Sequence, residues 1–248
     1  MRKYQLLICK LIDRIFYRHF FFAYKALYFN YKNISERKRL NRLKNIVKPG
    51  MNVLDIGANI GFYSIFLAKL VGEKGRVHAF EPDELNFCNL EKNTKKYRNV
   101  VINRLAVGEK SEEILLYHSD VLNVDCQTFD SGENRRTTKV KCVAIDDYFK
   151  AAEKVDLVKI DIQGYDYFAL KGMARTLERS KNIVILGEFS PYGLKKTGID
   201  PAAYLKLLEE LGFAVEIANG SNREELLKKS GDELFYTDFF AFKRKAPK

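Results

Sequence analysis

Residues 53–61 read Val53-Leu54-Asp55-Ile56-Gly57-Ala58-Asn59-Ile60-Gly61, and a second apolar run over residues 76–80 is followed by Glu81-Pro82. An apolar strand, a glycine-bearing loop and an amphipathic helix, followed by a strand that ends in an acid, are typical of a nucleoside-binding βαβ unit. Small residues in the loop let the backbone approach a ligand closely. Glu81 is placed to accept hydrogen bonds from two ribose hydroxyls. The stretch therefore predicts a nucleoside site at the carboxyl end of a parallel sheet.

The loop departs from the dinucleotide fingerprint. A pyrophosphate site needs G-x-G-x-x-G, and here Asn59 and Phe62 stand where the second and third glycines belong. Asp55, at the entrance of the loop, would repel a pyrophosphate but favour an ammonium or sulfonium group. We therefore predict S-adenosylmethionine (SAM) as the ligand. The residues predicted to bind it are Asp55, Gly57, Ala58, Asn59 and Gly61 at the methionine end, Glu81 at the ribose and Asn103 beside the adenine.

Strand and helix patterns alternate from residue 46 onward. The core strands are predicted over residues 52–56, 76–80, 100–103, 155–161 and 182–188. The longer helices are predicted over 61–71, 83–96 and 201–211, the last of them ending at Gly212 as its C′ glycine. Two closing strands, 213–218 and 235–243, are expected to pair antiparallel at one edge. The alternation predicts an α/β fold with a doubly wound, mostly parallel, Rossmann-like sheet and a ligand site above the carboxyl ends of its strands.

Two segments outside this alternation also carry predictions. A polar, turn-rich stretch over residues 118–139 is predicted to be an irregular insertion, with strands at 113–117 and 139–144 on its two sides. A short helix before the first strand is predicted to begin at Ser35 as its N-cap.

The net charge of +11 resides in the N-terminal 48 residues. That segment holds thirteen of the 43 Lys and Arg residues but only two of the 32 Asp and Glu residues, so the rest of the chain is electrically balanced. We therefore divide the chain into a basic helical extension, 1–48, and one α/β domain, 49–248.

The extension is predicted to form a basic, aromatic-rich amphipathic helix. Charged residues interrupt any signal-peptide core, and no run of about 18 uncharged residues is present that could span a bilayer. Three roles are open: a cap or homodimer element on the core, a helix over residues 1–33 lying on an anionic membrane, and a contact with nucleic acid. The last is disfavoured, because the aromatic residues fill the apolar flank of a helix rather than a binding groove.

The cysteines at positions 9, 88, 126 and 142 show neither C-x-x-C spacing nor histidine partners nearby. Zinc and a disulfide framework are therefore not indicated. Reduced thiols favour a cytoplasmic protein, with peripheral contact at the inner membrane surface if the extension lies on lipid.

Four blocks, over residues 53–64, 75–82, 158–166 and 169–173, together resemble the FkbM-type SAM-dependent methyltransferase family. The likeness covers roughly residues 46–190 in family order. It implies a class I methyltransferase fold with a seven-stranded sheet and, most often, O-methylation of a sugar or polyketide hydroxyl. Gln163 and Asp166 stand where this family usually has glutamate. Gln163 removes a charge, whereas Asp166 keeps the charge on a shorter side chain.

Transfer of the methyl group to an aliphatic hydroxyl needs a group that accepts the hydroxyl proton. Asp161, at the carboxyl end of the predicted strand 155–161, is the first candidate, and Glu188, at the end of the neighbouring strand, is the second. Each acid could instead cap a helix or form an ion pair. Together they could hold Mg²⁺ that acidifies the acceptor, although we assign no residue as a metal ligand.

Three functions stay open at this level. The favoured function is SAM-dependent O-methylation of a sugar, glycan or related small acceptor. An RNA ribose methyltransferase would use the basic extension to bind phosphates, whereas methylation of a base amino group is disfavoured because no proline follows Asp161. A non-catalytic SAM-binding or membrane-tethered protein is the third, because Gln163 lacks the usual charge.

Overall fold

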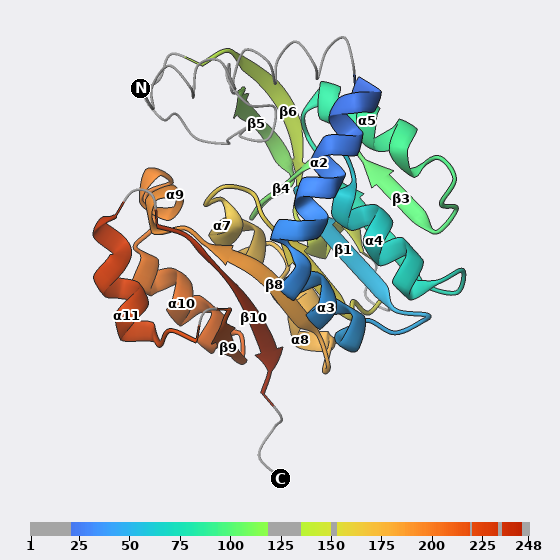
Figure 1. Cartoon of the computed structure of the whole chain (residues 1–248). Helices are drawn as coiled ribbons and strands as arrows, with labels where there is room; N and C mark the ends of the chain where they lie inside the picture. The colour runs from blue at the N-terminus through green and yellow to red at the C-terminus, as the bar shows by residue number, and fades with distance from the viewer. Residues whose placement is uncertain (1–20, 119–134, 150–152, 219, 233–234, 245–248) are drawn as a thin grey trace.

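The computed structural model describes residues 21–118, 135–149, 153–218, 220–232 and 235–244. A central sheet is covered by helices on both faces (Figure 1). Residues 1–20 of the predicted extension and 119–134 of the predicted insertion lie outside the described residues.

The central sheet has seven strands in the order β3-β2-β1-β7-β8-β10-β9. The strands from β3 to β8 in this order are parallel, and β10 runs antiparallel to both β8 and β9. Their bounds are β1 (Asn52–Ile56), β2 (Arg76–Phe80), β3 (Val100–Asn103), β7 (Leu157–Ile160), β8 (Val184–Phe189), β9 (Phe213–Ile217) and β10 (Thr237–Lys243). The predicted doubly wound, mostly parallel sheet with an antiparallel edge is confirmed. Its topological switch point lies between β1 and β7.

Side chains of β1 alternate between the two faces, as the two-residue period of a strand requires. Val53 packs in the core beneath α3 (Arg37–Ile46) and α4 (Phe62–Val71), whereas Leu54 and Ile56 pack in the core on the other face. Asp55 points to the same face as Val53 and meets Ser64 of α4. The alternation therefore buries one carboxylate beneath the loop that follows β1.

The helices divide between the two faces. The face with α3 and α4 also carries α5 (Glu84–Thr94) and, farther out, α2 (Phe21–Ser35). The other face buries residues of α6 (Ile145–Tyr148), α7 (Asp166–Lys171), α8 (Ala174–Arg179), α9 (Pro191–Lys196), α10 (Pro201–Glu210) and α11 (Arg223–Lys228). The sequence prediction had identified α4, α5 and α10 but not the six-residue helices α7, α8, α9 and α11, because one or two turns are too short to show a clear helical period.

Helix ends show one success and one error of the sequence prediction. Gly212, after α10, has φ +82° and is the expected glycine in the left-handed conformation. Ser35, predicted as the N-cap of α3, is instead the last residue of α2, and Glu36 occupies the N-cap position of α3 without a side-chain cap bond. The prediction failed because the carboxylate of Glu36 is drawn into contacts with Lys32, Arg39 and Tyr63.

A second sheet of three strands, in the order β4-β6-β5, flanks the central one. It comprises β4 (Ala106–Val107), β5 (Glu112–Tyr117) and β6 (Thr137–Val143). The predicted strands on the two sides of the insertion are thus confirmed, although β6 begins at Thr137 and takes in the end of the predicted irregular segment.

Candidate active site

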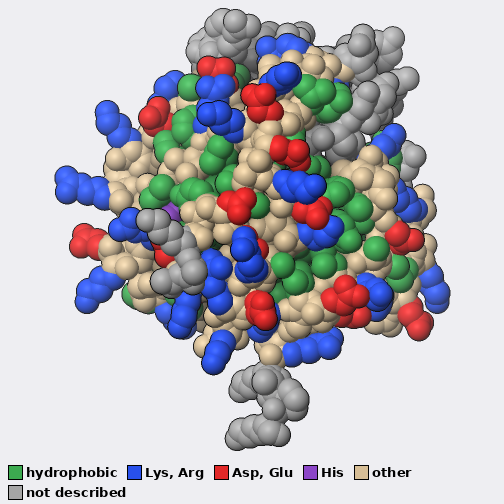
Figure 2. Space-filling model, turned by 180° about the vertical axis from the view of Figure 1, so that it is seen from behind, with side chains coloured by type: hydrophobic (Ala, Val, Ile, Leu, Met, Phe, Trp, Pro, Cys, Tyr) green, Lys and Arg blue, Asp and Glu red, His purple; other side chains and the backbone are tan. Residues whose placement is uncertain are grey.

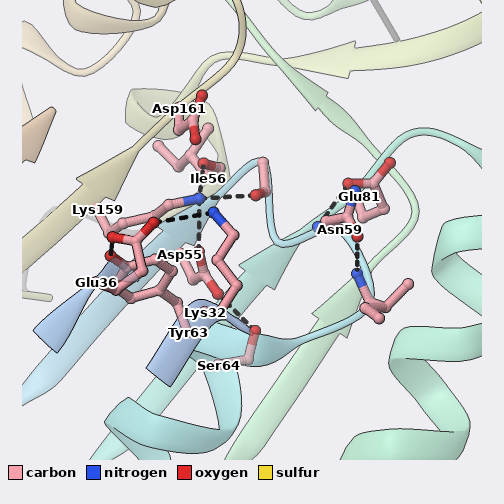
Figure 3. A network of polar contacts seen from close by, with 12 residues as sticks. Lys32, Glu36, Asp55, Ile56, Asn59, Tyr63, Ser64, Glu81, Lys159 and Asp161 are labelled. Carbon is pink, nitrogen blue, oxygen red and sulfur yellow. Dashed lines mark hydrogen bonds and ion pairs between the residues drawn. The ribbon is translucent and has the colours of Figure 1, made fainter. Parts of the chain in front are cut away.

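Asp55 lies beneath the loop rather than on its surface. Its side chain is fully buried; one oxygen accepts a hydrogen bond from Ser64 Oγ at 2.6 Å, and the other lies 3.3 Å from Lys159 Nζ (Figure 3). We predicted that the free charge of Asp55 would select a cationic ligand. The structure corrects this reasoning: Lys159 compensates the charge, so the pair is neutral, and a buried carboxylate touches no ligand unless the loop moves.

Lys159 is a residue of the candidate site that the sequence analysis missed. It stands opposite Asp55 in the parallel register of β1 and β7, and its ammonium donates to the carbonyls of Gly57 at 2.7 Å and Ile56 at 3.3 Å. Burial lowers the pKa of Lys159, but the adjacent carboxylates of Asp55 and Asp161 raise it by more, so the group stays charged. Lys159 therefore fixes the end of β1 and the start of the loop.

The backbone amides of the loop are all occupied within the protein. Those of Gly57 and Ala58 donate to the carbonyl of Phe80, at 3.1 and 2.9 Å, and that of Asn59 donates to Glu81 at 2.8 Å. The amides of Ile60 and Gly61 donate to the Asn59 side chain and the Ala58 carbonyl. A phosphate site depends on free amides, so this loop offers no cradle for a pyrophosphate.

Gly57 cannot be replaced by a larger residue in this packing. Its φ is +76°, and a Cβ there would lie 2.1 Å from the carbonyl oxygen of Asp161. The end of β7 therefore lies directly against the loop, which brings Asp161 to the rim of the predicted donor site.

Glu81 connects the tip of β2 to the loop. One oxygen accepts from the amide of Asn59 at 2.8 Å (Figure 3). The other accepts from the amide of Asp83 at 3.1 Å. Burial raises the pKa of this carboxyl to about 7. The Asn86 side chain donates to Glu81 as well. A carboxylate offers about four acceptor positions, so about one stays free for a ribose hydroxyl. Asn103, predicted beside the adenine, lies at the end of the adjacent β3, where its carbonyl accepts from the Glu81 amide at 3.1 Å.

Glu81→Ala should weaken SAM binding by about 1.5–3 kcal/mol, or about 10- to 150-fold, through loss of charge-assisted hydrogen bonds. Titration calorimetry with SAM measures the change. Glu84→Ala, which removes an exposed carboxylate paired with Arg104 in the same region, is the control and should leave the affinity unchanged. Equal affinity of Glu81→Ala and the native protein would remove Glu81 from the ribose site.

Asp161 and Gln163 form the turn after β7. Gln163 has φ +58°, and its side-chain amide donates to Asp161 Oδ1 at 3.3 Å. An ionised glutamate at position 163 could only accept, and it would place a second negative charge beside Asp161. The glutamine therefore does what the usual family residue would not do here: it orients Asp161 by a hydrogen bond.

Four carboxyl groups surround the ends of β7, β8 and β10. Glu188 stands directly opposite Asp238 in the antiparallel register, and burial together with the charges of Asp161, Asp166 and Asp238 raises its pKa to about 9. Burial and Asp161 raise the pKa of Asp166 to about 7. Arg39, from α3, is ion-paired with Asp238. The two predicted catalytic acids, Asp161 and Glu188, thus lie within one electrostatic cluster.

Glu188→Gln should stabilise the ligand-free protein at alkaline pH. Because the folded pKa of about 9 lies above the ordinary 4.5, folded protein retains a proton that unfolded chain releases, so stability falls as pH rises between these values. At alkaline pH the variant should have a Tm several degrees above that of the native protein, since each kcal/mol of added stability raises the Tm by about 2–4 °C. At acid pH the two Tm values should be equal. Thermal melts across this pH range measure the effect, with the exposed Glu224→Gln as control. An unchanged pH profile would contradict the placement of Glu188.

The junction of α2 and α3 reaches the same site. Glu36 accepts a hydrogen bond from Tyr63 Oη at 2.7 Å, and the Tyr63 ring lies 5.5 Å from Lys159 Nζ (Figure 3). Tyr24 of α2 packs on Ile60 of the loop. The described part of the extension therefore forms a wall beside the loop, a contact between distant segments that the sequence could not reveal.

The two buried histidines, His78 and His118, have structural partners. His78 is buried, with Nδ1 3.0 Å from Tyr148 Oη, and burial lowers its pKa to about 4. His118 is paired with Asp83 at 2.9 Å. Within the part of the chain that the structure describes, no three His, Cys, Asp or Glu side chains are grouped so as to hold a metal ion.

Comparison with known protein families identifies this chain. The family model described as "Methyltransferase FkbM domain" matches residues 55–215. The chain belongs to the FkbM methyltransferase family. This membership confirms the predicted family, with SAM as its cofactor. The loop amides are occupied within the protein, which argues against a pyrophosphate ligand.

Two relatives and one solved structure place this FkbM methyltransferase among known proteins. Hexuronic acid methyltransferase AglP of Haloferax volcanii is 29% identical over 178 residues, which are 69% of this chain and 66% of AglP. The tRNA (adenine(58)-N(1))-methyltransferase TrmI of Thermus thermophilus is 36% identical over 64 residues, 26% of this chain and 25% of TrmI. The chain thus spans just under two thirds of one relative and a quarter of the other.

The structural likeness concerns the fold. A candidate methyltransferase of Streptococcus mutans, solved in complex with SAH, superposes with a TM-score of 0.51 at 13% identity, covering 84% of this chain and 97% of that one. The class I methyltransferase fold predicted for the FkbM chain is therefore confirmed.

Proposed function

We propose that this FkbM methyltransferase transfers the methyl group of SAM to a hydroxyl of a sugar, glycan or related small acceptor. The observation that carries the proposal is the position of Asp161, which is held by Gln163 at the rim where β7 lies against the loop. The sugar as acceptor is supported by the likeness to AglP, whose name specifies a hexuronic acid.

In the proposed reaction, the SAM sulfonium supplies an activated methyl group. The acceptor oxygen forms the new C–O bond as the C–S bond breaks, and its proton passes to the carboxylate of Asp161. Glu81 holds the ribose, while Lys159 and Ser64 keep the floor of the loop rigid through Asp55. Positioning of this kind accounts for much of the rate enhancement in a reaction whose electrophile is already activated.

Glu188 is the second proposed proton acceptor. Its raised pKa makes it a stronger base than an ordinary glutamate, although it holds a proton in the ligand-free protein at neutral pH. The positive charge of SAM would lower this pKa and release the proton, so Glu188 could act only with the donor in place.

The test is methyl transfer from isotopically labelled SAM to three acceptor classes: neutral hexosides, hexuronic acid glycosides and RNA. Mass spectrometry of the products identifies the methylated class, and repetition with a chelator tests for a role of Mg²⁺. Labelled sugar without labelled RNA is expected. Labelled RNA alone would favour the ribose methyltransferase, and SAM binding without any product would favour a non-catalytic SAM-binding protein.

A hexuronic acceptor poses an electrostatic question that the same assay answers. Its carboxylate would enter a rim with four acidic groups, of which Glu188 is protonated at neutral pH in the ligand-free protein. The guanidinium of Arg39 is already paired with Asp238 and Glu36. Like charges that lie close together repel unless a countercharge is supplied. We therefore expect the neutral hexosides to be the better substrates.

A further inference from the structure

The outward side of α2 carries no charged side chain. Its exposed residues are Phe22, Ala23, Ala26, Leu27, Asn30, Tyr31, Asn33, Ile34 and Ser35. Three of them, Leu27, Tyr31 and Ile34, are 66%, 66% and 78% exposed and recur at helical spacing, so they form one continuous ridge. A helix on the surface of a monomer usually turns charged and polar residues outward, whereas the exposed polar residues of this helix are uncharged and the ridge itself is apolar.

The two lysines of α2 are turned toward the protein instead. Lys32 pairs with Glu36 at 3.0 Å, and Lys25 lies 5.5 Å from the centre of the Phe29 ring. The inner side of the helix is also occupied, because Tyr24 packs on Ile60. One side of α2 is therefore already packed on the protein, and the ridge lies on the side that faces away from it.

Cations border the ridge, and exposed acids are missing from this segment. Arg37 and Lys38, at the start of α3, are exposed. Among the described residues 21–48, the only acid is Glu36, which is 3% exposed and ion-paired. The opposite face of the molecule differs, since basic and acidic side chains are interspersed there (Figure 2).

We propose that the outer face of α2, bordered by Arg37 and Lys38, docks on an anionic lipid surface. The ridge would enter the boundary between headgroups and acyl chains, and the cations would contact the headgroups. A second copy of the chain is a poorer occupant, because a two-fold contact would bring two positive segments together. RNA is poorer too, because leucine, isoleucine and alanine offer neither stacking nor hydrogen bonds to bases.

The docked helix would lie in the plane of the membrane. None of the helices in the described ranges is both long and apolar enough to cross a bilayer. Figure 1 shows α2 on the outside of the molecule, next to α4 and α3. Docking on its outer side leaves the contacts with Ile60 and Tyr63 intact, so it requires no refolding.

The test is sedimentation of the full-length protein with vesicles of phosphatidylcholine, with or without about 30% phosphatidylglycerol. The native protein should bind the anionic vesicles and lose binding in high salt. The variant Leu27→Gln/Tyr31→Gln/Ile34→Gln should bind anionic vesicles at least tenfold more weakly than the native protein, because each 1.4 kcal/mol of lost burial energy lowers the affinity about tenfold. The variant Arg37→Gln/Lys38→Gln should also bind anionic vesicles more weakly than the native protein. Leu85→Gln and Leu115→Gln remove exposed leucines of other elements, 46% and 43% exposed, and should bind as the native protein does.

Unchanged SAM affinity in the triple variant would show that it is folded. The proposal would be overturned if the native protein did not bind anionic vesicles, or if the triple variant bound them as well as the native protein does. Sedimentation velocity measures the oligomeric state of the native protein and of the triple variant. If the native protein is a dimer that does not bind vesicles, and the triple substitution abolishes this dimer, the ridge is an interface between copies and the lipid proposal is wrong.

Discussion

Lys159→Met is expected to abolish SAM binding and to lower the free energy of unfolding by about 3–5 kcal/mol, the usual cost of leaving a buried charge without its partner. The ammonium of Lys159 meets Asp55 and two carbonyls of the loop, and its side chain is only 7% exposed. Removal leaves the Asp55 carboxylate, which is fully buried, with Ser64 alone. Chemical denaturation and titration calorimetry measure the two effects.

A matched pair of variants separates the charge from the geometry. Lys181→Met removes an exposed lysine before β8 and should change neither quantity. The double variant Asp55→Asn/Lys159→Met removes both charges, and it should recover most of the stability because no buried charge is left unpaired. It should not recover SAM binding, since the Gly57 carbonyl still lacks its donor. Full binding in the double variant would show that Lys159 only neutralises Asp55.

Asp161→Asn should lower kcat by about 10²- to 10⁴-fold, the usual contribution of a positioned proton acceptor, with SAM affinity nearly unchanged. Asparagine preserves the size of the side chain, and its oxygen can still accept from Gln163, so the turn should persist. The measurement is single-turnover methyl transfer to the acceptor found in the screen, at saturating SAM.

Asp156→Asn is the control for this second substitution. Asp156 precedes the amino end of β7 and accepts from the Asn52 amide at 2.8 Å, a contact that asparagine can also make. Its kcat should match that of the native protein. If Asp161→Asn retains full activity while Glu188→Gln loses it, the roles of the two acids are reversed; if both retain activity, neither accepts the proton.

Local patterns were sufficient for the framework. The bounds predicted for β1, β2 and β3 match the structure, because a short apolar run bounded by turn residues is typical of a strand buried on both faces of a parallel sheet. The glycine at 212 and the order of the family blocks were likewise visible in the chain. The short helices were missed and the beginning of β6 was displaced by two residues, since six or seven residues carry little periodicity.

The reason for SAM specificity shows the limit of sequence reasoning. The sequence predicted SAM from an unpaired Asp55, whereas the structure pairs Asp55 with Lys159, 104 positions later, and occupies the amides of the loop. SAM as the cofactor is confirmed by the family, but the charge of Asp55 is not the reason, because Lys159 compensates it. Which residue of β7 stands opposite Asp55 depends on strand order and register, and no local pattern specifies either.

The chain by itself determined the fold class, the family and the positions of the loop and the strand-end acids, because these follow from periodicity, glycine placement and motif order. Only the tertiary structure decided which distant groups compensate one another: Lys159 with Asp55, Tyr63 with Glu36, and Asp238 opposite Glu188. It also decided which side of α2 is packed and which is free. Such pairings depend on the approach in space of segments that are far apart in sequence. Burial then strengthens the interaction between the paired charges, because the dielectric constant of the interior is low.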